Sequence, residues 1–165
     1  MFEYFIGIDP GVNGAVSILG KSGEVVDCFD LPVLMDGNKK TLNTRSIFNK
    51  IKEITGDSLA FCTIERVQAM PKQGVSSTFA FGRAFGQLEG IASCMGWSII
   101  LVRPRAWQKN FFAFASGSNT KEKSRQVSMG LYPTVDLSLK KHHNKADSLL
   151  IAEYGRRYQQ MEVSS

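Results

Sequence analysis

The sequence has few of the features that mark secreted, zinc-binding or membrane proteins. It contains only three cysteines, Cys28, Cys62 and Cys94, which are widely spaced in apolar stretches. Neither a disulfide framework nor a zinc motif is therefore expected. No segment approaches the roughly 20 apolar residues of a membrane-spanning helix, and the first residues lack the pattern of a signal peptide. We therefore expect a cytoplasmic protein with no membrane partner.

The composition is that of a globular domain with a small excess of positive charge. Hydrophobic residues make up 43% of the 165 residues and charged residues 21%. A chain of this length can bury one core, so we expect a single domain over residues 1–165. The net charge of +5 suits a polyanionic partner. A mild basic excess also occurs in proteins that bind nothing charged, so charge alone decides little.

An apolar run that ends on a carboxylate stands near the start of the chain. Residues 5–9 read Phe-Ile-Gly-Ile-Asp, and Pro10, Gly11 and Gly14 follow. Proline cannot donate to a strand ladder and glycine permits positive φ, so the chain should turn after Asp9 and return as an antiparallel strand. A carboxylate at the end of a buried strand is costly without a cationic partner. Taken alone, this stretch fits either a metal site or an ordinary hairpin.

Two further carboxylates occupy comparable positions. Residues 59–65 form a second apolar strand, which ends at Glu65. If the two strands are parallel neighbours, both carboxylates emerge at the same edge of the sheet. Asp147 shares the apolar stripe of the last helix with Leu150 and Ile151. An acid that compensates the helix dipole would occupy the same place.

Periodicity and turn signals predict the elements in between. A strand over residues 24–32 would complete a three-stranded meander, and the polar residues 35–40 are expected to form a loop. Thr44 is expected to cap a helix that stops at Gly56.

A long helix is expected from Ser76 or Ser77 to about Met95. Gly82, Gly86 and Gly90 form one smooth stripe along it. Interior glycines cost about 1 kcal/mol each relative to alanine, so a close approach should compensate for them. Tight packing on the sheet is the favoured explanation, and a subunit interface or room for a DNA backbone are the alternatives.

Basic residues gather in the second half of the chain. A short buried strand over residues 98–102 leads into a helix that begins near Pro104 and includes Trp107, a combination that suits a phosphate-facing surface. Thr120 should cap the next helix, whose first half carries Lys121, Lys123 and Arg125. Cations near a helix N-terminus oppose the macrodipole, which favours an anionic ligand there. Solvated helix ends would have a similar composition.

The ordered set of motifs resembles the RuvC-type Holliday junction resolvases of the RNase H-like superfamily, particularly their phage-encoded branch. The matching stretches are residues 7–11, 64–65, 103–107, 121–133 and 145–152. The resemblance implies an α/β, RNase H-like fold with a five-stranded mixed sheet flanked by helices. It also implies a homodimeric endonuclease that uses Mg²⁺ or Mn²⁺ to cut four-way (Holliday) or branched DNA junctions.

The resemblance further implies roles for individual residues. Asp9 would bridge or anchor two metal ions, Glu65 would hold one and Asp147 the other. Lys121 would lie near the scissile phosphate, with Lys123 as a substitute. Two divalent ions about 4 Å apart can activate a water and stabilise the leaving oxygen. Carboxylates supply the hard oxygen ligands that such ions prefer.

The fourth metal ligand departs from the family pattern. The family places a carboxylate, or in some members a histidine, three or four residues before the last aspartate, where this chain has Asn144 and His143. We predict that His143 is the ligand, because imidazole binds Mn²⁺ well and asparagine offers only a neutral oxygen. Alternatively, Asn144 replaces an aspartate in an inactivated protein.

Two other functions are compatible with parts of the pattern. A junction-binding or DNA-binding homologue of the same fold with impaired catalysis would explain the missing fourth acid. The Asp-x-Gly turn also resembles the phosphate loop of the actin and sugar-kinase superfamily, but that architecture needs a chain more than twice as long.

Basic side chains on several elements are the expected contacts to DNA phosphates. They are Lys39, Lys40, Arg66, Lys72, Arg83, Arg105, Lys109, Lys121 and Lys123. Affinity for DNA should then fall steeply with salt. Met70 in the loop over residues 66–74, and Phe79 after it, are candidates to wedge between bases at the junction centre. Phe79 would equally suit the core.

Overall fold

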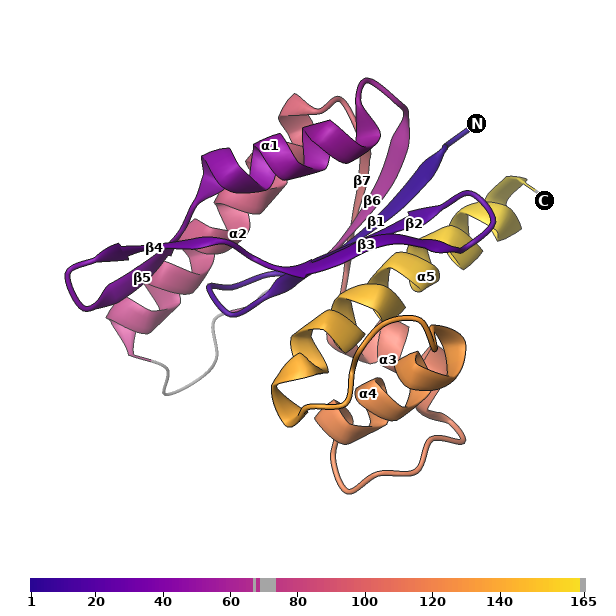
Figure 1. The fold of residues 1–165 in the computed structure, drawn as a ribbon. Coiled ribbons are helices and arrows are strands. Elements are labelled where there is room, and N and C mark those ends of the chain that lie inside the picture. The colour runs from indigo at the N-terminus through magenta and orange to yellow at the C-terminus, as the bar shows by residue number, and fades with distance from the viewer. Residues whose placement is uncertain (67, 69–73, 164–165) are drawn as a thin grey trace.

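The computed structural model describes residues 1–66, 68 and 74–163, and it is built on a five-stranded mixed sheet (Figure 1). The strands are β1 Tyr4–Asp9, β2 Ala15–Gly20, β3 Val25–Asp30, β6 Ala60–Glu65 and β7 Ser98–Val102. Their order in the sheet is β3-β2-β1-β6-β7. β2 is antiparallel to β1 and β3, whereas β6 is parallel to β1 and β7. The predicted mixed sheet is confirmed.

Helices cover both faces of the sheet. They are α1 Thr44–Thr55, α2 Val75–Cys94, α3 Pro104–Phe112, α4 Thr120–Leu131 and α5 His143–Val163, with a 3-10 turn, η1, at Lys140–His142. α1 and α2 lie on one side of the sheet, and α3, α4 and α5 lie on the other (Figure 1). None of the helices in the described part of the chain combines the length and hydropathy needed to span a membrane.

The hydrophobic cores on the two faces of the sheet follow from the two-residue period of the strands. Ile6 and Ile8 of β1 pack with Leu88 of α2 on one face. Phe5 points to the other face and packs with Leu149 of α5. Successive side chains of a strand alternate between faces, so a strand that is apolar throughout must be covered on both. The sheet is therefore the central layer of the molecule.

The N-caps of α1, α2 and α4 lie one to three residues before the predicted ones. Asn43 and Asn119 cap α1 and α4, and each accepts a 3.1 Å hydrogen bond from a backbone N–H of the first turn. Thr44 and Thr120 are the first helical residues instead. α2 begins at Val75, with no side-chain cap. The asparagine side chain carries an oxygen that accepts a hydrogen bond from a first-turn N–H, which explains why the caps of α1 and α4 lie one residue earlier than predicted.

Residues 33–42 form a β-hairpin, so the prediction of a polar loop over residues 35–40 is wrong. Its strands are β4 (Val33–Asp36) and β5 (Lys39–Leu42). Gly37 and Asn38 form the two-residue turn, in which Gly37 adopts a φ of 59°, and Gly-Asn is a recognised pair for such turns. The hairpin extends from the body of the protein (Figure 1).

The glycine stripe of α2 does not pack on the sheet, so the favoured explanation of its sequence is wrong. A Cβ atom added at Gly82, Gly86 or Gly90 would meet no described atom within 4 Å. α2 packs inward through Ala84 and Leu88 instead. The stripe therefore lies on the exposed side of the helix.

The strand predicted to be buried at residues 98–102 is an edge strand. β7 pairs with β6 and ends the sheet on that side. Its Ser98 and Leu101 are exposed, whereas Val102 is buried. Its apolar composition hid the edge position, because Ile99 and Ile100 are half-buried and pack against the cores on opposite faces of the sheet.

Candidate active site

Two parallel strands bring Asp9 and Glu65 to the same edge of the sheet. β1 pairs with β6 in a register that sets Ile8 opposite Ile64. Asp9 and Glu65 are the next residues and the last of their strands. This is the carboxyl edge, where open α/β sheets place their sites. The predicted parallel neighbours are confirmed.

A close helix–strand contact brings Asp147 to the same place. α5 crosses β1 at Gly7, where an added Cβ would lie 2.1 Å from the Ser148 backbone oxygen and 2.3 Å from the Ala152 nitrogen. Only glycine permits this approach. Asp147 precedes Ser148, so the contact fixes Asp147 beside the end of β1.

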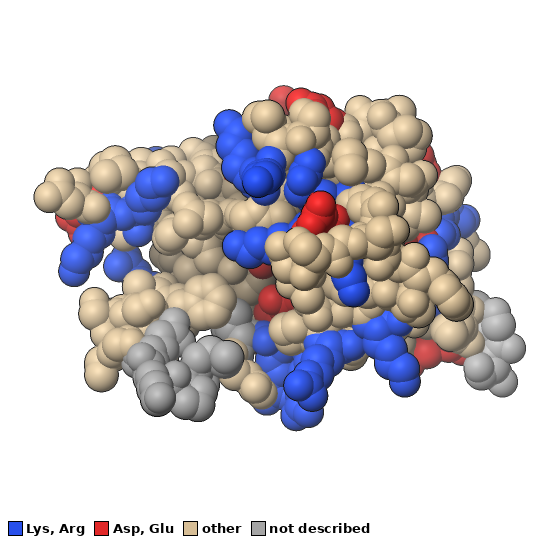
Figure 2. All heavy atoms as spheres, turned by 90° about the horizontal axis from the view of Figure 1, so that it is seen from below, with Lys and Arg blue, Asp and Glu red and all other residues tan. Residues whose placement is uncertain are grey.

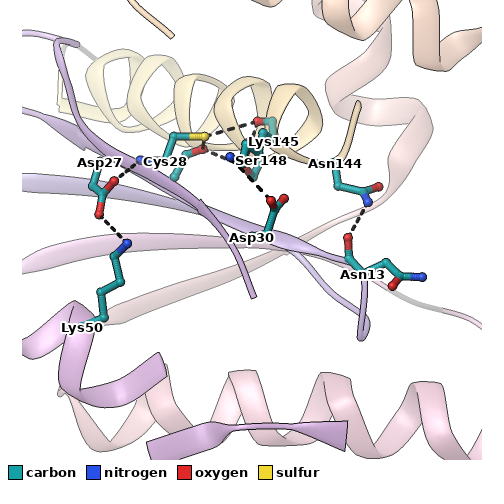
Figure 3. Close-up of polar contacts among 9 residues, drawn as sticks. Asn13, Asp27, Cys28, Asp30, Lys50, Asn144, Lys145 and Ser148 are labelled. Atoms are coloured by element: carbon teal, nitrogen blue, oxygen red, sulfur yellow. Dashed lines mark hydrogen bonds and ion pairs between the residues drawn. The ribbon is translucent and has the colours of Figure 1, made fainter. Parts of the chain in front are cut away.

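Polar contacts tie the first turn of α5 to the sheet (Figure 3). The Asn144 side-chain amide donates to the backbone oxygen of Asn13, in the turn that follows β1. Lys145 forms a 3.5 Å ion pair with Asp30, at the end of β3. These contacts and the Gly7 contact together set the position of Asp147 relative to Asp9.

The three carboxylates act on one another electrostatically. Burial raises the pKa of Asp9 well above its usual value, and repulsion from Asp147 and Glu65 raises it further, against the opposing effect of Lys121. Burial also raises the pKa of Glu65, and Asp147 adds to this rise, while a hydrogen bond from Trp107 opposes it. The predicted acids therefore lie near enough to one another, and to Lys121, for these charges to influence how readily the acids ionise.

Burial raises the pKa of Asp147 to about 6. A hydrogen bond from Ser124 and the charge of Lys121 both act to lower it. A buried acid with a pKa this high lacks enough positive charge nearby in the protein to offset the effect of its burial. The Lys121 side chain itself is exposed, at the start of α4.

Two hydrogen-bond donors to the acids were missed in the sequence. Trp107 Nε1 donates to Glu65 Oε2 over 2.7 Å, and Ser124 Oγ donates to Asp147 Oδ1. Trp107 is 1% exposed, so the prediction that it belongs to a phosphate-facing surface is wrong. The sequence carries no signal for either bond, because Ser124 and Ser128 stand one helical turn apart like many surface serines, and only the structure shows that both are fully buried on α4.

The donor set suits a hard divalent cation. Carboxylate oxygens are the preferred ligands of Mg²⁺ and Mn²⁺. A cation among Asp9, Glu65 and Asp147 would oppose the burial that raises the pKa of all three acids, and the repulsion that adds to it at Asp9 and Glu65. Within the described residues, no three His, Cys, Asp or Glu side chains are close enough to enclose a metal ion. The chemistry of the residues therefore fits a metal, while the positions of the side chains do not form a complete ligand cage.

The two candidates for the fourth ligand form hydrogen bonds with different segments of the chain. The Asn144 side-chain amide donates a hydrogen bond to the backbone oxygen of Asn13, in the turn after β1. His143 is the first residue of α5, and its Nδ1 lies 3.0 Å from the backbone oxygen of Lys140. The role of His143 as a metal ligand stays a prediction.

The predicted DNA-contacting residues lie on several elements. Lys39 and Lys40 are on β5, Arg66 follows β6, Arg83 is on α2, Arg105 and Lys109 are on α3, and Lys121 and Lys123 are on α4. All are exposed except Lys123, which is half-buried. Met70 and Lys72 lie outside the described residues. Figure 2 shows Lys and Arg side chains around a hollow in which acidic atoms are visible.

Solved structures of RuvC share this architecture. The chain is 15% identical to T. thermophilus RuvC in complex with a Holliday junction substrate, with 94% of each chain covered and a TM-score of 0.66. For another Thermus thermophilus RuvC structure the values are 17%, 95% of each chain and 0.57. No family model and no curated protein sequence matches the chain. The likeness shows that the chain has the RuvC-like, RNase H-like fold.

Proposed function

We propose that the protein is a divalent-metal-dependent endonuclease that resolves four-way or otherwise branched DNA. The observation that carries the proposal is the electrostatic coupling of Asp9, Glu65 and Asp147, with Lys121 beside them, at the carboxyl edge of the sheet. A solved structure with the same fold contains a Holliday junction substrate. The motif resemblance extends the proposal to a cytoplasmic resolvase of the phage-encoded branch.

The roles of the residues follow from their positions. Asp9 is repelled by both other acids, so Asp9, together with Glu65 and Asp147, would hold the Mg²⁺ or Mn²⁺ ions. Such ions, when bound, supply Lewis-acid activation of water and of the phosphodiester. His143 would complete the ligand set. Lys121 is exposed and would stabilise negative charge on the phosphate oxygens.

Binding of DNA would rest on phosphate contacts from the exposed basic side chains. Preference for a junction over duplex would come from shape, because these contacts carry little sequence information. Phe79 is 73% exposed on α2, so it does not fill the core. Its exposure supports a role as a wedge between bases, and the companion prediction for Met70 concerns a residue outside the described part.

A homodimer would place two such sites on one junction. α2 supplies a candidate interface, because its glycine stripe is open and Val75 on the same helix is 88% exposed. Smooth glycine surfaces permit close approach of a second helix. Two-fold symmetry would then match the symmetry of a four-way junction.

The direct test uses the native protein and a synthetic four-way junction, with a linear duplex of the same sequence as control. We expect cleavage of the junction in Mg²⁺ or Mn²⁺, none in a chelator, and little or none of the duplex. Tight junction binding without cleavage in either metal would favour the alternative, a catalytically impaired homologue. Absence of preferential binding to the junction would contradict the proposed resolvase, and absence of any DNA binding would contradict both functions.

A further inference from the structure

We propose that Trp107 and Ser124 are positioning residues that hold the Glu65 and Asp147 carboxylates in the orientation required for metal binding. The inference rests on the proposed function, and it names residues of this chain that neither the motif resemblance nor the comparisons assign. Each residue acts through an acid and does not itself contact the metal or the substrate.

Trp107 is held rigidly. It is 1% exposed, packs with Val102 and Leu150, and makes an edge-on contact with the Phe112 ring at 5.6 Å. The sheet sets where Trp107 lies in the fold, because β7 pairs with β6 and α3 begins two residues after β7 ends. An indole fixed in this way presents its N–H to Glu65 at one defined point, 2.7 Å from Oε2.

Ser124 performs the same task for Asp147 from a different helix. Its fully buried hydroxyl donates to Oδ1. One turn later, Ser128 is equally buried, but its hydroxyl donates to the backbone oxygen of Ala146 over 3.0 Å. Two serines thus dock α4 on α5, and only Ser124 bonds to an acid of the site.

Each bond occupies one oxygen of a carboxylate and orients the other. Among described residues, Trp107 is the one hydrogen-bond donor to Glu65, and Ser124 is the one donor to Asp147. The second oxygens, Glu65 Oε1 and Asp147 Oδ2, are therefore available to a cation. Outer partners of metal ligands fix ligand orientation, and their loss typically weakens metal binding 10–100-fold.

The second tryptophan shows that the Trp107 bond is not a general property of buried indoles here. Trp97 is 7% exposed, and its Nε1 has no hydrogen-bond partner among the described residues. The protein contains only these two tryptophans. Trp97→Phe is therefore a matched control for Trp107→Phe, and Ser128→Ala is the matched control for Ser124→Ala.

The test measures Mn²⁺ binding in the absence of DNA, from the electron paramagnetic resonance signal of free Mn²⁺. We expect Trp107→Phe and Ser124→Ala each to raise the Mn²⁺ dissociation constant roughly 10–100-fold, while Trp97→Phe and Ser128→Ala leave it unchanged. Melting curves in a chelator accompany each titration, because a purely structural role would lower the melting temperature and leave the dissociation constant at its native value.

Fluorescence gives a second, independent readout. In Trp97→Phe the remaining tryptophan is Trp107, whose emission should change on Mg²⁺ addition with the same constant as metal binding. In Trp107→Phe the remaining emission, from Trp97, should not respond.

The outcomes separate this inference from the proposed function. If the native protein binds no Mn²⁺, the proposed metal site fails and the inference fails with it. If the native protein binds Mn²⁺ and both variants bind it equally well, only the inference is overturned. Loss of cooperative melting in both variants would assign them to the scaffold and would also overturn it.

Discussion

Asp147 ionises at a cost to the folded protein. Its pKa is raised by burial to about 6, from an ordinary value of 3.8. Between these two values the folded protein keeps a proton that the unfolded chain releases, so stability falls as the pH rises through this window. The difference of about two pKa units corresponds to about 3 kcal/mol of lost stability above pH 6.

We predict that Asp147→Asn stabilises the metal-free protein at pH 7.5 by up to about 3 kcal/mol, and that this gain disappears at pH 4. Chemical denaturation in a chelator at the two pH values measures it. Asp136→Asn is the control of opposite sign, because bonds from Ser138 lower the pKa of that exposed acid. A gain for Asp147→Asn that is no larger at pH 7.5 than at pH 4 would contradict the assignment.

The acids could be predicted from the sequence, but the residues that hold them could not. Asp9 and Glu65 each end a wholly apolar strand, and Asp147 interrupts an apolar helix stripe. Such positions can be recognised from the order of the residues alone. The bonds from Trp107 and Ser124 depend on where α3 and α4 dock, and side-chain periodicity does not specify docking.

At the scale of elements, the β4–β5 hairpin is the main correction. The polar composition of residues 35–40 concealed it, although Asp36-Gly37-Asn38 carries the turn signal. A hairpin holds its side chains more firmly than a loop does. Lys39 and Lys40 are consecutive strand residues, both exposed, so their side chains point to opposite faces of the hairpin.

We expect both hairpin lysines to contact phosphates of the junction, one on each face of the hairpin. The double variant Lys39→Gln, Lys40→Gln should weaken binding and make the log–log salt dependence of affinity shallower by about 1.8, which is about 0.9 for each lost contact. Fluorescence anisotropy at several salt concentrations measures the slope. Lys21→Gln is the control, because Lys21 follows β2 at the end of the sheet opposite Asp9. An unchanged slope in the double variant would remove the hairpin from the DNA interface.

The exposed face of α2 illustrates a second limit at this scale. Three glycines at four-residue spacing indicate a smooth helix face, but they do not tell which face the sheet covers. The small Ala84 and the apolar Leu88 lie on the covered side, and Gly86 lies between them in sequence on the other. The open stripe is consistent with the proposed subunit contact.

At the scale of the whole molecule, the fold explains why distant residues meet. β1 and β6 are parallel neighbours, and Gly7 allows α5 to cross β1 closely. Residues near positions 9, 65 and 147 therefore share one edge. The fold was predicted through the resemblance of the ordered motifs to the RuvC-type resolvases, and the strand order of the sheet agrees with it.

The central claim is that Asp9, Glu65 and Asp147 form one metal-dependent nuclease site, and single-turnover cleavage of a four-way junction by Asp9→Asn and Glu65→Gln tests it most directly. Both amides keep the shape of the acid, and glutamine retains an oxygen that can accept the Trp107 bond. We predict that cleavage in Mg²⁺ or Mn²⁺ is abolished, while junction affinity is unchanged or higher because a negative charge near the phosphates is lost. Near-native cleavage by either variant would contradict the account.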